Sequence, residues 1–116
     1  AEAVEHGLPK QSLERVVERA GIQGPARVKL MHRVVPAATY KRRQRLKLVE
    51  SERTERLARV IALAEMLWDD DAEAKRFLAT PHAELGGRKP IEAALTDLGA
   101  RQVEDIVMRA LHGLPV

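Results

Sequence analysis

The stretch Ser51–Trp68, S-E-R-T-E-R-L-A-R-V-I-A-L-A-E-M-L-W, is the clearest helix of the sequence. Its apolar residues recur every three or four positions, the spacing that places them on one face of an α-helix. We expect Ser51 to cap the first turn, because a serine hydroxyl accepts a hydrogen bond from a free N–H. We expect the helix to end at Asp69-Asp70, since aspartate disfavours helix interiors and favours the start of a following helix. The apolar face consists of Leu57, Val60, Ile61, Ala64, Leu67 and Trp68.

The charges are divided unevenly around this helix. Residues 1–47 carry eleven Lys and Arg against four Asp and Glu, and residues 48–116 carry nine against thirteen. A basic half in a chain of net charge +3 indicates that this half has a polyanionic partner.

The composition predicts packed helices in a cytoplasmic protein. One Trp, one Tyr and one Phe leave a core of Leu, Val, Ile and Ala. Because the sequence has no cysteine, disulfides and thiolate metal sites are excluded, which fits the cytoplasm. No apolar run approaches the ~20 residues needed to span a bilayer, and no signal-like segment opens the chain. We therefore expect no membrane partner.

Glycine and proline divide the remaining sequence into short helical segments, and no alternating strand pattern of any length is present. This pattern predicts an all-α fold of six or seven helices with short connections. A loop is expected at residues 82–89. The expected helices besides the central one are Lys10–Ala20, a helix from Gly24-Pro25, a helix from Pro36 through Lys47, Ala72–Ala79 behind an Asp70 cap, a short helix from Pro90, and a last helix from the Thr96 cap to about His112.

Two short helices joined by a tight turn, the second rich in cations, are typical of a helix-turn-helix. In that motif the second helix enters the major groove, and its N-terminal residues, here Ala37–Tyr40, face base edges. Five cations follow within residues 41–47 and would neutralise phosphates. The alternative is a solvated helix face with the cations that favour a helix C-terminus. The predicted DNA-binding residues are Thr39, Tyr40, Lys41, Arg42, Arg43 and Arg45.

The sequence contains no recognisable catalytic or metal-binding arrangement. None of its four histidines has a partner at H-x-x-x-H or H-E-x-x-H spacing. Asp69-Asp70-Asp71 lacks the alternating oxygens of an EF-hand loop, so a helix cap is the favoured interpretation. Residues 85–90, L-G-G-R-K-P, contain glycines and cations but not the order of a phosphate-binding loop. We expect no enzyme, no metal and no cofactor.

Several short motifs, taken in order and spacing, resemble a known family. The second half resembles the Xre/MbcA/ParS antitoxins with their C-terminal toxin-binding domain, and the first half, from Gly7-Leu8-Pro9, is similar to their divergent Xre-type (Cro-like) helix-turn-helix. The similarity covers roughly residues 7–116. This chain has Phe77-Leu78 where the family usually carries Trp-Leu. The motifs are Glu50-Ser51-Glu52-Arg53, Arg59 to Ala64, Ala74-Lys75-Arg76-Phe77-Leu78, Pro81-His82-x-x-Leu85-Gly86-Gly87-x-x-Pro90, Gly99-Ala100-x-x-Val103 and His112-Gly113.

The resemblance implies an antitoxin of a type II toxin–antitoxin pair. Its partner would be a RES-domain toxin that degrades NAD⁺ or uses it for ADP-ribosylation, and the C-terminal region would cover the active site of that toxin. The helix-turn-helix would bind operator DNA and repress the antitoxin's own promoter, as a homodimer within a toxin–antitoxin hetero-oligomer. This division assigns residues 1–48 to DNA binding and residues 49–116, built on the long central helix, to toxin binding.

The C-terminal end offers an apolar tail beside a carboxylate. Such a tail can enter a cleft of the toxin while the carboxylate meets an arginine there; the alternative is that Leu111 packs within its own helix layer and the last residues fray. Gly86, Gly87 and Pro90 favour a rigid turn, which leaves Arg88 and Lys89 as contacts. A stand-alone repressor whose acidic half serves dimerisation is the alternative function. The predicted toxin-binding residues are Arg88, Lys89, Arg109, Leu111, His112, Leu114 and Val116.

Overall fold

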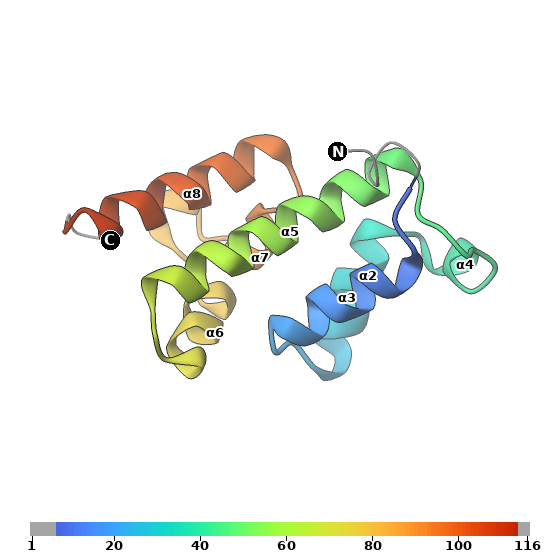
Figure 1. Ribbon diagram of the computed structural model, residues 1–116, viewed down its shortest axis with the longest axis horizontal. Helices are drawn as coiled ribbons and strands as arrows, with labels where there is room; N and C mark the ends of the chain where they lie inside the picture. Colours follow the sequence, from blue (N-terminus) through green and yellow to red (C-terminus); the bar gives the residue numbers. More distant parts are fainter. Residues whose placement is uncertain (1–6, 114–116) are drawn as a thin grey trace. The chain divides into compact units, whose positions relative to one another are not determined.

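A computed structural model of the chain describes residues 7–113 (Figure 1). The described residues contain no strand, and Pro9 and Arg45 form an isolated bridge. The expected all-α fold is therefore confirmed. The helices are α2 (Lys10–Arg19), α3 (Gly24–Val34), α4 (Ala37–Tyr40), α5 (Leu48–Leu67), α6 (Asp71–Ala79), the 3₁₀ helix η1 (Ala83–Leu85), α7 (Pro90–Ala93) and α8 (Asp97–Leu111).

The chain forms two compact units that divide inside α5. The first unit ends at Glu55 and the second begins at Arg56. In the first unit α2 packs against α3, and in the second α7 packs against α6 and α8. The buried apolar side chains include Leu13, Val17, Leu30, Val34, Val35 and Leu46 of the first unit, and Leu57, Val60, Ile61, Ala64, Leu78, Leu85, Ile91, Val103, Ile106 and Val107 of the second.

Three helix ends lie at capping or terminating residues that the sequence indicates. The Asp70 carboxylate accepts a hydrogen bond from the Ala72 N–H at 2.9 Å, and the Thr96 hydroxyl accepts one from the Gly99 N–H at 3.0 Å. Gly21, which follows the C-cap residue Ala20 of α2, has a left-handed φ of 76°, which glycine adopts without steric cost. These three predicted boundaries are confirmed, and each rests on a local interaction.

The expectation that Ser51 caps the central helix is wrong. Helix α5 begins earlier, at Leu48, and the buried Ser51 hydroxyl instead accepts a hydrogen bond from the Leu8 N–H at 2.9 Å. The capping role belongs to Glu50, whose carboxylate accepts from the Lys47 N–H at 2.8 Å. A glutamate at the third helical position often satisfies a free N–H in this way.

The expectation of a helix from Pro36 through Lys47 is also wrong, because α4 ends at Tyr40. Single hydrogen bonds from the N–H groups of Arg42 and Arg43 extend the turn, and the chain then becomes extended. Residues 44–46 pair with residues 8–10, since the Lys10 N–H donates to Gln44 at 3.2 Å and the Leu46 N–H donates to Leu8 at 2.8 Å. This pairing uses backbone groups that a continuing helix would need for itself.

In the second unit, two arginines tie α5 to the elements that follow it. The Arg56 guanidinium donates to the Leu95 carbonyl at 2.9 Å, and Arg59 pairs with Glu104 of α8 at 2.6 Å. The ring centroids of Trp68, the residue after α5, and Phe77 of α6 lie 4.8 Å apart, so the two rings pack the chain at the end of α5 against α6. These contacts give the second unit a continuous set of packed helices.

Candidate functional site

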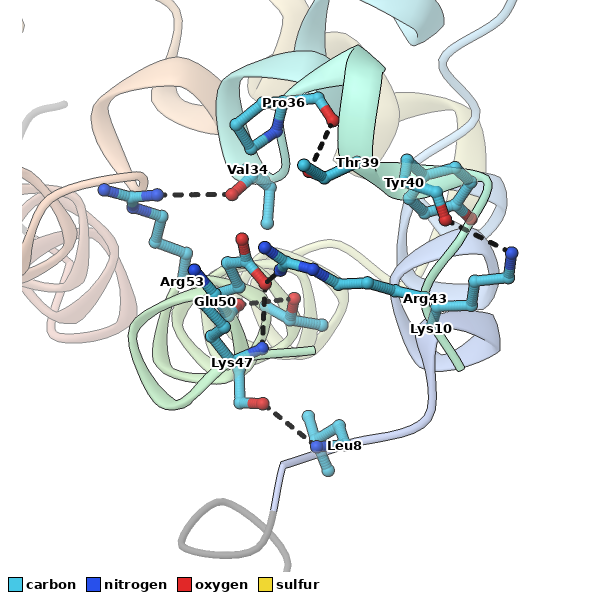
Figure 2. A network of polar contacts seen from close by, with 12 residues as sticks. Leu8, Lys10, Val34, Pro36, Thr39, Tyr40, Arg43, Lys47, Glu50 and Arg53 are labelled. Carbon is cyan, nitrogen blue, oxygen red and sulfur yellow. Dashed lines mark hydrogen bonds and ion pairs between the residues drawn. The ribbon is translucent and has the colours of Figure 1, made fainter. Parts of the chain in front are cut away.

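Helices α3 and α4, joined by the turn at Val35-Pro36, are the two helices for which the sequence predicted a helix-turn-helix (Figure 2). The Arg53 guanidinium donates to the Val34 carbonyl at 3.2 Å, which satisfies an acceptor at the end of α3. The Thr39 hydroxyl donates to the Pro36 carbonyl at 3.1 Å. The turn is thus held at both ends, and the predicted DNA-binding residues from Thr39 to Arg43 lie together in α4 and the turn after it.

Two of the predicted DNA-binding cations have partners inside the protein. Arg43 forms an ion pair with Glu50, and their side chains are 19% and 5% exposed (Figure 2). Arg45 donates to the Gly7 carbonyl at 2.8 Å. Both guanidiniums therefore stabilise the chain segment that follows α4, whatever further contacts they make.

Five exposed cations of the first unit have side chains with no hydrogen bond or ion pair to any other residue between 7 and 113. Three of them are not among the predicted DNA-binding residues: Lys47, which was expected to neutralise phosphates, and the pair Lys29 and Arg33, for which no role was expected. They are four residues apart on α3 and share one face of that helix. The sequence did contain a signal for these two cations, because their four-residue spacing lies within the first helix of the predicted helix-turn-helix. The five are Lys29, Arg33, Lys41, Arg42 and Lys47.

Tyr40, the last residue of α4, is engaged by α2. Its hydroxyl donates to a Glu14 carboxylate oxygen at 2.5 Å, and the Lys10 ammonium lies 4.9 Å from the centre of its ring. Burial, followed by the hydrogen bond with Glu14, raises the pKa of Tyr40 above its ordinary value of about 10. The raised pKa means that the phenol keeps its proton, and can donate it to Glu14, to a higher pH than an ordinary tyrosine does.

The predicted toxin-binding residues that the structure describes lie in the second unit, and two of them join the loop before α7 to α8. Arg88 donates to the Leu85 carbonyl at 2.8 Å and to Gln102 of α8 at 3.1 Å. Arg109 of α8 pairs with Glu84 at 2.5 Å, and this hydrogen bond raises the pKa of Arg109. Arg88 and Arg109 thus lie at one junction between the loop and α8.

The loop expected at residues 82–89 contains the 3₁₀ helix η1 (Ala83–Leu85), and the glycines after it form a compact turn. Gly86 and Gly87 have φ angles of 66° and 81°. The His82 N–H donates to Arg88 at 3.1 Å and the Gly87 N–H donates to His82 at 3.0 Å, which closes the loop. The Lys89 N–H donates to Glu92 at 3.3 Å at the start of α7.

The C-terminal end of α8 is partly accessible. Leu111 is 38% exposed, and His112 is exposed as well. The predicted contacts Leu114 and Val116 lie outside the described residues. The outer face of α8 also carries exposed Leu98 and Met108, which were not predicted as contacts although the helical spacing places them opposite the buried stripe.

Two further properties bear on function. Among residues 7–113, no group of three or more His, Asp or Glu side chains is arranged to hold a metal ion. No helix in the described part of the chain is long and apolar enough to cross a bilayer.

Both units match models of known families. The model of the antitoxin Xre-like helix-turn-helix domain matches residues 1–59. The model of the antitoxin Xre/MbcA/ParS C-terminal toxin-binding domain matches residues 63–113. The chain belongs to the Xre/MbcA/ParS antitoxin family. A curated relative, Antitoxin Xre of Pseudomonas putida, is 32% identical over 84 residues, which are 69% of this chain and 53% of the relative.

Membership of the Xre/MbcA/ParS family confirms the resemblance inferred from the short motifs, with a helix-turn-helix domain in the first half and a toxin-binding domain in the second. The chain spans about half the length of the curated relative it matches. The helix-turn-helix match contains α2, α3 and α4, and the toxin-binding match contains α6, α7 and α8.

Proposed function

We propose that this antitoxin binds a RES-domain, NAD⁺-consuming toxin and covers its active site. The match of residues 63–113 to a toxin-binding domain is the observation that carries this proposal. The family resemblance supplies the RES class of the partner. We assign residues 49–116 to this role and residues 1–48 to DNA binding. The antitoxin needs no cofactor for either role, because it acts by occupying surfaces.

The C-terminal end of α8 is the proposed point of contact with the toxin. It combines an apolar side chain, Leu111, with the exposed His112 and with Arg109. Burial of one leucine side chain in a partner contributes about 1.5–3 kcal/mol before ordering costs. Arg88 and Lys89 add cations near the same helix, and Leu114 and Val116 extend the proposed contact.

We expect Leu111→Asp to weaken inhibition of the toxin at least tenfold, because a carboxylate would replace an apolar contact at the interface. Leu98→Asp is the matched control. Leu98 is also exposed on α8, but 13 residues away, about 20 Å along a helix. Inhibition titrations of both variants test the assignment. Full inhibition by Leu111→Asp, with weakened inhibition by Leu98→Asp, would move the contact to the start of α8.

We further propose that the helix-turn-helix binds operator DNA in the cytoplasm as a homodimer and represses the antitoxin's own promoter. Helix α4 would face the bases through Thr39. The exposed cations Lys41, Arg42 and Lys47 after α4, with Lys29 and Arg33 of α3, would contact phosphates, since none of their side chains is engaged by the described protein. Arg43 and Arg45 would support DNA binding mainly by holding the segment after α4 in place, through their contacts with Glu50 and the Gly7 carbonyl.

We expect the double variant Lys41→Ala/Arg42→Ala to bind operator DNA with a shallower dependence on salt. Removing one phosphate-binding cation lowers the slope of log K against log salt by about 0.9, so removing two lowers it by about 1.8 per protomer. Arg76→Ala/Arg101→Ala is the control, because it removes the same charge from exposed helices of the second unit. Equal slopes for the two double variants would contradict the assignment.

A further inference from the structure

Helix α4 is too short to be stable by itself. It consists of four residues, and isolated helices shorter than about 12–15 residues are marginal in water. Its N-terminal turn is held locally by the hydrogen bond between Thr39 and Pro36. Its C-terminal residue, Tyr40, has its side-chain contacts with α2, so the orientation of α4 depends on that helix.

Two side chains of α2 hold Tyr40 from different directions (Figure 2 shows Lys10 and Tyr40). The Glu14 carboxylate accepts the phenol proton at 2.5 Å, while the Lys10 ammonium lies 4.9 Å from the ring centre, within the range of a cation–π interaction. The same ammonium donates to the Tyr40 carbonyl at 3.3 Å and to the Lys41 carbonyl at 3.5 Å. The Tyr40 carbonyl also accepts from the Arg43 N–H at 3.3 Å, so the Lys10 ammonium adds a second donor at the end of α4.

Lys10 and Glu14 are four residues apart, so they share one face of α2. The phenol has a single O–H donor, and Glu14 uses it. A phosphate or a base acceptor therefore cannot receive that proton unless the contact with Glu14 breaks. This arrangement differs from the expectation that Tyr40 itself contacts DNA.

We infer that Tyr40 is a positioning residue, which Glu14 and Lys10 hold so that α4 and the turn at Lys41-Arg42 are presented to DNA in one orientation. This inference rests on the proposed binding of operator DNA. It assigns Lys10, Glu14 and Tyr40 to specific recognition without contact to the bases. Because phosphate contacts lie elsewhere, non-specific binding does not depend on the three residues.

The test measures binding of the full chain to its own promoter DNA and to a scrambled duplex of equal length. Glu14→Ala and Glu14→Gln remove the same charge, but only the glutamine keeps an acceptor for the phenol. We expect Tyr40→Phe to bind promoter DNA about tenfold more weakly than the wild type does. We expect Glu14→Ala to bind it about tenfold more weakly than Glu14→Gln does. Tyr40→Phe/Glu14→Ala should be no weaker than either single variant, because one interaction is lost in all three.

Binding to the scrambled duplex and the salt slope should stay unchanged in every variant. A loss in Tyr40→Phe without a loss in Glu14→Ala relative to Glu14→Gln would overturn the positioning role, because Tyr40 would then contact DNA directly. Losses that add in the double variant would overturn it as well. A wild-type chain that does not distinguish promoter from scrambled DNA would overturn both the positioning role and the proposed operator binding.

A second measurement tests the hydrogen bond between Tyr40 and Glu14 in the absence of DNA. Tyr40 is the single tyrosine of the chain, so ultraviolet absorbance follows its ionisation directly. The pKa of Tyr40 is raised in the folded protein. The contribution of Tyr40 to the free energy of unfolding is therefore complete below about pH 10, the ordinary tyrosine pKa, and is lost as the pH rises through the folded-state pKa. We expect ionisation above pH 10 in the wild type and a lower transition in Glu14→Ala. An unchanged transition in Glu14→Ala would contradict the hydrogen bond.

Discussion

Replacing Glu50 by alanine is expected to lower the free energy of unfolding of the chain by about 3 kcal/mol. The substitution leaves the Arg43 guanidinium, 19% exposed, without its ion-pair partner. It also leaves the Lys47 N–H at the start of α5 without the acceptor that lies 2.8 Å away. Removing one member of a buried pair costs about 3–5 kcal/mol, and the partial exposure of Arg43 favours the lower end.

Denaturant unfolding followed by circular dichroism measures this loss, and the thermal unfolding midpoint should fall by about 10 °C or more. Glu50→Gln separates the ion pair with Arg43 from the cap on the Lys47 N–H, because the amide oxygen can still accept from Lys47 while the charge is lost. The free energy of unfolding of Glu50→Gln should lie between those of the wild type and Glu50→Ala. Glu52→Ala, an exposed position on the same helix, is expected to stay within about 0.5 kcal/mol of the wild type. Equal effects of Glu50→Ala and Glu52→Ala would contradict the structural role of the pair.

Gly99→Ala is expected to destabilise the second unit by about 3 kcal/mol or more. A Cβ atom at Gly99 would lie 1.9 Å from the Ala93 carbonyl oxygen and 2.9 Å from the Thr96 hydroxyl, which caps α8. The first obstacle is backbone, so the α7–α8 junction must open to admit the methyl group. Gly99 does not have a positive φ, and the expected cost therefore comes from this close approach.

Gly86→Ala is the matched comparison for that prediction. A Cβ atom there meets nothing within 4 Å, but the φ angle of 66° is strained for alanine. A left-handed alanine costs about 1–2 kcal/mol. Thermal unfolding of the two variants should therefore rank Gly99→Ala as the more destabilised, and the opposite order would show that the junction relaxes easily.

Local chemistry explains why much of the fold could be predicted from the sequence. Asp70 and Thr96 cap helices that follow them directly, and Gly21 ends a helix through its own backbone conformation. The buried residues of α5 follow the 3.6-residue spacing. Each of these signals lies within a few residues of the structure it determines, so a single sequence is sufficient to read it.

The wrong predictions have a different physical origin, because they depend on residues far apart in the chain. Nothing near Ser51 indicates that its hydroxyl accepts from Leu8, 43 residues away. Likewise, residues 36–47 have the composition of a helix, but their pairing with residues 8–10 and the contact of Arg43 with Glu50 end α4 at Tyr40. Tertiary contacts override local helix propensity here.

The same distinction applies to the candidate site. The cation-rich stretch after Tyr40 was visible in the sequence, but only the structure separates Arg43 and Arg45, whose guanidiniums have partners in the protein, from Lys41 and Arg42, whose side chains have none among the described residues. The contact of Tyr40 with Glu14 joins residues 26 positions apart, so no local pattern predicts it.

The most direct test of the proposed antitoxin function is NAD⁺ loss catalysed by a RES-domain toxin encoded next to the antitoxin gene, titrated with the full chain and with a version ending at Arg109. We expect the full chain to stop NAD⁺ loss near one equivalent per toxin site and the shortened chain to fail. Inhibition by both would keep the antitoxin function and transfer the block to the remaining helices of the second unit. If the full chain neither binds nor inhibits the toxin, the central proposal is contradicted, and a stand-alone repressor becomes the better account.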